Sequence, residues 1–148
     1  MPLNDTLREQ VGMYLEMMLA FNSIDHDLIW KYIIVVASQL EYLTIHILLV
    51  HDCEDPNKFW EYEERTTLNQ AVKKLKEKKI LSSDIHDIIN AIANLRNSVL
   101  HRKVLTGITE YAVYKGRKVF YDPDAFQQLT EESTHAIDEI NAWLACNK

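Results

Sequence analysis

The feature that most constrains this chain is its shortage of residues that end helices and form turns. The 148 residues include only three glycines and three prolines, and this combined share is about a third of the average. Sandwiches, barrels and repetitive α/β chains need turn residues at short, regular intervals. The composition, with 47% hydrophobic residues, therefore predicts an all-α fold. We expect an up-and-down bundle of four to five helices that forms a single domain over residues 1–148.

Hydrophobic periodicity predicts where the helices lie. Polar capping residues mark several of their starts, and Pro123 follows the capping residue Asp122 at the first position of the last helix. Phe59, Trp60 and Tyr62 are expected to pack a short turn over the bundle. The helices are expected from Asn4 or Asp5 to Ala20, from Ile24 or Asp27 to His51, from Thr67 to Lys79, from Ser82 or Ser83 to about His101, and from Asp122 to Leu144.

One segment breaks the helical pattern. Residues Ile108–Tyr114 and Arg117–Tyr121 are rich in aromatic and β-branched side chains, and they flank the turn pair Lys115-Gly116. The pattern predicts a small β-hairpin inserted before the last helix.

Several features bear on location. The stretch Leu28–Val50 is long enough to cross a bilayer, but Lys31, Gln39, Glu41 and His46 interrupt it, so we expect a buried core helix and no membrane partner. The charged amino-terminal residues do not form a signal peptide. Cys53 and Cys146 are lone thiols without metal-ligand spacing. We expect a cytoplasmic protein.

The charges are distributed unevenly along the chain. Residues 65–118 contain twelve Lys or Arg and four Asp or Glu, whereas the rest of the chain contains four bases and eighteen acids. A basic segment in an acidic protein can hold a polyanion on one face. The alternative is a chance fluctuation among solvated helix faces.

A motif that can carry chemistry lies near the end of the fourth predicted helix, at Arg96-Asn97-Ser98-Val99-Leu100-His101. It resembles the Arg-Asn-x-x-x-His motif of the HEPN superfamily, whose members are small helical-bundle proteins and in many cases metal-independent endoribonucleases. Leu40-Glu41 resembles the acidic position that supports this motif, and Thr67–Ser82 resembles the helix and turn that lead into it. Members paired with a nucleotidyltransferase antitoxin usually carry Tyr two residues after the histidine, whereas Arg102-Lys103 follow here.

The residue types fit the implied activity. The Arg96 guanidinium matches two phosphate oxygens, and the His101 imidazole changes protonation near neutral pH. In RNA the adjacent 2′-hydroxyl can attack the phosphate once a base removes its proton. The expected products carry 2′,3′-cyclic phosphate and 5′-hydroxyl ends. We expect no metal and no cofactor, because the remaining histidines lack ligand spacing.

Other residues are assigned supporting roles. Glu41 is expected to pair with Arg96, or with another local base, and Asn97 to orient His101 or to bridge backbone groups. Lysines of the third predicted helix can attract RNA, but such clusters more often solvate a helix. The expected RNA-binding residues are Ser98, Arg102, Lys103, Lys115, Arg117 and Lys118.

Helical geometry sets a condition on this site. Residues five apart lie about 140° apart around a helix, so Arg96 and His101 share no face unless the helix ends or distorts between them. In the family that the motif resembles, two copies meet across a homodimer, so a composite site is expected here. The partners would be RNA, a second copy and an antitoxin protein. The alternatives are a noncatalytic HEPN-like module that binds nucleotide, RNA or a regulatory protein, and a plain helical adaptor.

Overall fold

The computed structural model describes residues 9–13, 26–106 and 112–147. Residues 9–13 are helical, and the rest of the predicted first helix lies outside the described residues. The all-α class is confirmed, with one short antiparallel hairpin before the last helix. In chain order the elements are α2 (His26–His51), a 3-10 turn (Pro56–Lys58), α3 (Phe59–Arg65), α4 (Leu68–Glu77), α5 (Ser83–Thr106), β1 (Val113–Tyr114), β2 (Arg117–Lys118) and α6 (Pro123–Cys146).

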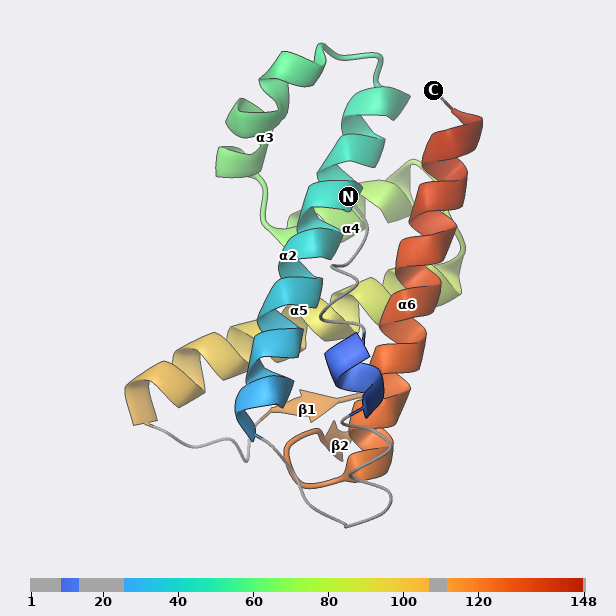
Figure 1. Ribbon diagram of the computed structural model, residues 1–148. Helices are drawn as coiled ribbons and strands as arrows, with labels where there is room; N and C mark the ends of the chain where they lie inside the picture. Colours follow the sequence, from blue (N-terminus) through green and yellow to red (C-terminus); the bar gives the residue numbers. More distant parts are fainter. Residues whose placement is uncertain (1–8, 14–25, 107–111, 148) are drawn as a thin grey trace.

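The helices form two crossing layers. In Figure 1, α2 and α6 run in the same direction, while α4 and α5 lie behind them, cross them and run opposite to each other. The consecutive helices α4 and α5 are thus antiparallel, as in an up-and-down bundle. The helices α2 and α6 are parallel, which differs from strict alternation along the four long helices. The last turns of α5 extend beyond α2, away from the other helices (Figure 1).

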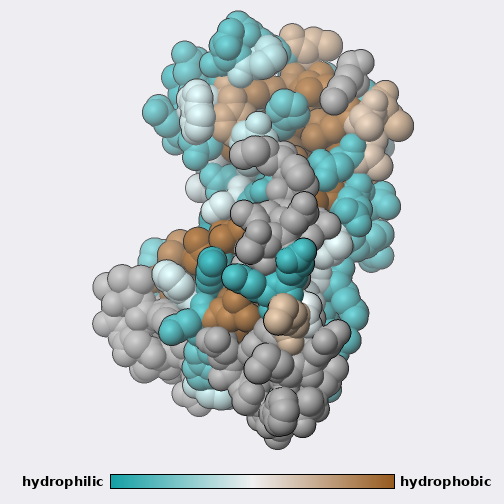
Figure 2. Space-filling model, viewed as in Figure 1, coloured by the Kyte–Doolittle hydropathy of each residue, from teal (hydrophilic) through white to brown (hydrophobic). Residues whose placement is uncertain are grey.

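The central element of the core is α2. It is long and apolar enough to cross a membrane by length and composition, and 56% of its most apolar window is buried inside the protein. It packs against α4, α5 and α6, which fits the expected core helix. Hydrophobic atoms also gather on the visible surface over the upper part of α2, between α3 and α6 (Figure 2).

Local sequence signals explain most element boundaries. A capping box begins α4, because Thr67 Oγ1 accepts from the Gln70 amide and the Gln70 side chain accepts from the Thr67 amide. Asp122 caps α6, and Pro123 follows it. In the hairpin, Lys115 and Gly116 both adopt positive φ angles, of 48° and 83°. This is the backbone of a tight turn that suits the twist of two antiparallel strands.

Scarce glycine leaves other turns to less suitable residues. Cys53, Lys79 and Leu81 adopt positive φ angles of 53°, 57° and 65°. Lys79 and Leu81 lie in the turn between α4 and α5. A side chain in this left-handed region costs about 1–2 kcal/mol per residue, so the tertiary packing of the two helices must hold the turn.

Two expectations about helix extent were wrong. The segment with Phe59, Trp60 and Tyr62 is not a short turn but the helix α3, in which Phe59 is buried while Trp60 is 69% exposed. In addition, α5 does not end at His101 but continues to Thr106. Gly107, a typical residue after a helix C-terminus, comes next in the sequence.

Candidate active site

Arg96 and Glu41 form a short, largely buried ion pair. Arg96 Nη1 lies 2.6 Å from Glu41 Oε2, and this contact joins α5 to α2. Both side chains are largely buried, with 17% and 21% of their surfaces exposed. The predicted pairing of these residues is confirmed. It holds the guanidinium at the border of the core rather than free in solvent.

Glu41 satisfies only part of the Arg96 guanidinium. Arg96 Nε is buried and has no hydrogen-bond acceptor. An ion pair with so little solvent contact depends on both partners, because either charge left alone would be poorly solvated.

His101 lies elsewhere on the same helix. Because α5 is continuous through Arg96 and His101, residues five apart point about 140° away from each other. His101 is exposed and lies in the C-terminal part of α5. Among the described residues, no hydrogen bond or ion pair links His101 to Arg96 or Glu41. A single chain therefore brings Glu41 and Arg96 together but leaves His101 apart.

Two of the four residues between Arg96 and His101, namely Asn97 and Ser98, are partly buried. Asn97 lies one turn before His101 and Ser98 lies between them in sequence. Within the described part of the chain, no hydrogen bond joins Asn97 to His101. The orienting role of Asn97 and the phosphate contact of Ser98 stay predictions.

The hairpin bases are held by acids of the loop and α6. Lys115 Nζ lies 2.7 Å from Glu132 Oε1, and Arg117 Nη2 lies 3.0 Å from Asp122 Oδ2. These ion pairs offset the positive charges of Lys115 and Arg117, two residues expected from the sequence to bind RNA. Lys118 is exposed, and the side chains of Arg102 and Lys103 lie outside the described residues.

The lysines of α4 and of the turn that follows it have fewer acidic partners. Lys73, Lys76 and Lys79 are exposed and form no ion pair among the described residues, whereas Lys78 Nζ lies 2.9 Å from Asp52 Oδ1. The roles of Arg102, Lys103, Lys115, Arg117 and Lys118 in RNA binding stay predictions. A polyanion could contact the exposed Lys73, Lys76 and Lys79 without displacing an acidic partner.

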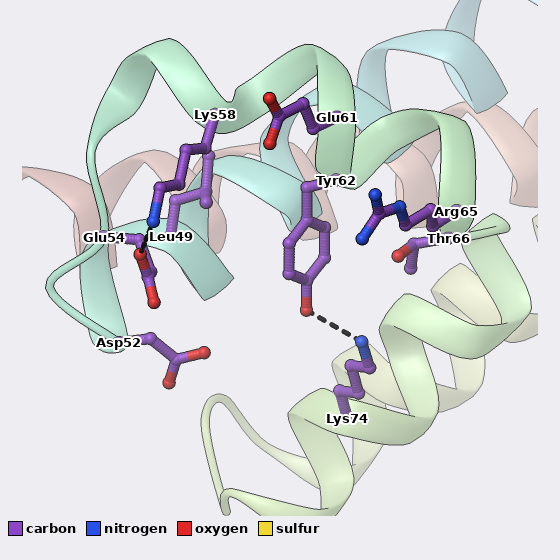
Figure 3. Close-up of a pocket in the computed structure, with 9 residues that line it drawn as sticks. All are labelled: Leu49, Asp52, Glu54, Lys58, Glu61, Tyr62, Arg65, Thr66 and Lys74. Atoms are coloured by element: carbon purple, nitrogen blue, oxygen red, sulfur yellow. Dashed lines mark hydrogen bonds and ion pairs between the residues drawn. The ribbon is translucent and has the colours of Figure 1, made fainter.

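A cavity of about 430 Å³ lies between the end of α2, α3 and Lys74 in the last turn of α4 (Figure 3). Lys74 Nζ lies 2.9 Å from Tyr62 Oη and 4.6 Å from the centre of its ring, and Lys58 Nζ lies 3.0 Å from Glu54 Oε2. Charges of both signs line the cavity, and Asp52 is paired with Lys78, which lies outside the lining. Neither Arg96 nor His101 lines it.

A tyrosine network ties the hairpin to α6. Tyr114 is fully buried, and its hydroxyl donates to Glu132 Oε1 at 2.6 Å. Burial and this hydrogen bond raise the pKa of Tyr114. Tyr114 therefore packs the hairpin against the bundle, while Tyr121 is 51% exposed.

Glu132 makes the stability of this network depend on pH. Burial alone would raise the pKa of Glu132, but hydrogen bonds from Lys115, Tyr114 and Gln128 outweigh it and lower the pKa. A carboxyl with a depressed folded pKa stabilises the protein above its unfolded pKa, and this is lost as pH falls through the folded value. As the pH falls from about 5 to about 3, we expect the free energy of unfolding to decrease less for E132Q than for the wild type.

Denaturant unfolding at several pH values measures this difference. Glu131, an exposed neighbour on α6, supplies the matched control E131Q, which should keep the acid sensitivity of the wild type. Equal acid sensitivity of E132Q and the wild type would contradict the expectation.

One feature next to the Arg96–Glu41 ion pair was not predicted from the sequence. Ser38, Glu41, Tyr42, Phe59, Trp60 and Glu63 line a hollow between α2 and α3. The aromatic cluster after Pro56 was the available signal, but it was interpreted as packing. Trp60 is exposed on this short helix, so the aromatic cluster does not serve packing alone.

No protein-family model, curated protein or solved structure matches this chain.

Proposed function

We propose that this protein is a HEPN-type, metal-independent endoribonuclease that acts as a cytoplasmic homodimer in a toxin–antitoxin or phage-defence setting. The observation that supports the proposal best is the Arg96–Glu41 ion pair within the Arg-Asn-x-x-x-His motif. An arginine clamped by a carboxylate at the edge of the core is pre-positioned for a phosphate. The expected antitoxin would bind the same chain as a protein partner.

The proposed reaction uses groups of this chain and of the RNA. Arg96 binds the scissile phosphate and stabilises the negative charge that grows on its oxygens. His101 removes the proton of the 2′-hydroxyl or donates a proton to the leaving 5′-oxygen. The 2′-oxygen forms a bond to phosphorus as the bond to the 5′-oxygen breaks. The products are a 2′,3′-cyclic phosphate and a 5′-hydroxyl.

The proposed mechanism needs a dimer because of the geometry of α5. Arg96 and His101 point apart within one chain, and His101 lies on an exposed part of the helix. A symmetric dimer that packs these segments together would place His101 of one subunit near Arg96 of the other.

RNA cleavage in EDTA tests the proposal. We expect H101A to lower the cleavage rate by about 100- to 10,000-fold, the range for a lost general acid or base. Because His101 is exposed, the H101A protein should be as stable as the wild type. DNA of the same sequence should survive, since it lacks the 2′-hydroxyl.

The matched control is H135A, which removes an exposed histidine on α6. It should cleave like the wild type. Cleavage that is unchanged in H101A, or that requires an added metal, would reject the mechanism.

The second candidate is a noncatalytic HEPN-like module that binds nucleotide, RNA or a regulatory protein. The separation of Arg96 and His101 in one chain favours it if the protein is a monomer. Sedimentation decides the oligomeric state. RNA binding that survives replacement of both residues, without cleavage, would select this function.

Arg102 and Lys103 give a separate prediction about RNA affinity. The double variant R102Q/K103Q should weaken binding and lower the slope of log affinity against log salt by about 1.4, or about 0.7 for each lost phosphate contact on a single strand. The control K73Q/K76Q removes the same net charge from α4. Equal effects of both variants would show that general electrostatics, not contact beside the motif, attracts the RNA.

A further inference from the structure

The hollow between α2 and α3 has an aromatic wall. Its volume is about 160 Å³. The rings of Tyr42 and Phe59 lie 4.9 Å apart, and those of Phe59 and Trp60 lie 5.2 Å apart. Phe59 is buried beneath, whereas Trp60 is 69% exposed and Tyr42 is 37% exposed. Two ring systems are thus presented to solvent at one small concavity.

The charged groups of this hollow are both acidic. Glu41 is engaged by Arg96. Glu63 is partly buried, and among the described residues its carboxylate has no ion-pair or hydrogen-bond partner. No lysine or arginine lines the hollow. It therefore offers an unpaired carboxylate next to aromatic faces, a combination that attracts a cation and repels a phosphate.

The size of the hollow limits its occupant. Liquid water takes about 30 Å³ per molecule, so the space holds roughly five waters. Pockets for whole drug-sized ligands have volumes of about 300–1,000 Å³. The space suits the end of a side chain that a larger partner inserts, not a complete metabolite.

We propose that this hollow receives an arginine side chain from a protein partner. A planar guanidinium can stack on the exposed Trp60 indole while it donates two parallel hydrogen bonds to the Glu63 carboxylate. Lysine fits less well, because its ammonium is a point charge without the fork or the flat face. A nucleobase could stack on the same ring, but it would leave the negative charge of the Glu63 carboxylate without a cationic partner.

The position of the hollow gives this contact a regulatory consequence. Glu41 lines the hollow and also holds Arg96. A partner anchored at Trp60 and Glu63 would lie directly beside the proposed catalytic arginine. The binding site does not depend on the proposed nuclease activity, and its test uses no cleavage reaction.

Peptide binding to the full chain tests the proposal. The probe is a short Gly/Ser peptide with one central arginine, compared with peptides that carry citrulline or lysine at that place. We expect the arginine peptide to shift the NMR signal of the Trp60 indole N–H, which is assigned by its loss in W60A. It should bind at least tenfold more tightly than the citrulline peptide.

Matched variants locate the contact. E63Q and W60A should each weaken arginine-peptide binding at least fivefold, whereas E64Q, which neutralises an exposed acid on the same helix outside the hollow, should have no effect. Equal binding of the citrulline peptide, or equal effects of E63Q and E64Q, would overturn the proposal. A Trp60 shift caused by single-stranded RNA but not by the arginine peptide would identify a nucleobase site instead. Loss of a dimer in E63Q would identify a second copy as the occupant.

Discussion

Replacing Glu41 with alanine is expected to lower the free energy of unfolding by about 2–4 kcal/mol, near the values for breaking a buried ion pair. The Arg96 guanidinium would keep its charge at a site where only 17% of its side chain meets solvent. Its Nε already lacks an acceptor, so loss of Glu41 removes the one ionic partner that the structure shows for it. Urea unfolding at neutral pH measures the difference.

A double replacement separates the cost of the lone charge from the worth of the pair. E41L/R96M puts apolar groups of similar length at both positions, and we expect it to recover most of the stability that E41A loses. The exposed Glu64 supplies the control, because E64A should change stability by at most about 0.5 kcal/mol. A cost of E41A no larger than that of E64A would mean that the pair behaves like a surface contact.

Mixed dimers give the second large effect. Subunits with E41L/R96M, mixed with H101A subunits, are expected to recover about a quarter of wild-type RNA cleavage, although each variant alone is inactive. Random mixing makes half of the dimers heterodimers. In each of these, one of the two symmetric sites combines an intact Arg96 from one subunit with an intact His101 from the other.

Differently tagged subunits show whether heterodimers form, so that a negative result can be interpreted. The control mixture replaces H101A with the triple variant E41L/R96M/H101A and should stay inactive. Heterodimers that form but do not cleave would show that Arg96 and His101 do not share a site across the subunits.

The sequence predicted the elements whose signals are local. The Asp122-Pro123 start of α6 and the Lys115-Gly116 turn each need only a few neighbouring residues. The pairing of Glu41 with Arg96 was also predictable, because a carboxylate within an apolar helix needs a partner.

Other features depend on tertiary structure that no local pattern records. The parallel course of α2 and α6 follows from how the layers cross (Figure 1). The exposure of Trp60 depends on how α3 lies against α2, because Phe59 turns inward and Trp60 does not. Ion pairs between the hairpin bases and the acids of Asp122 and Glu132 likewise arise only after folding. The overrun of α5 was different, since Gly107 marked its end in the sequence.

The left-handed turn between α4 and α5 also has a consequence for engineering. Lys79 is exposed, so its side chain contributes little burial while its backbone stays in an unfavourable conformation. Glycine adopts that conformation without the steric penalty. The chain thus holds an untapped stability reserve at a position outside the Glu41–Arg96 contact and outside the hollow beside Trp60. A scaffold reinforced there would tolerate destabilising changes at both places and keep them measurable.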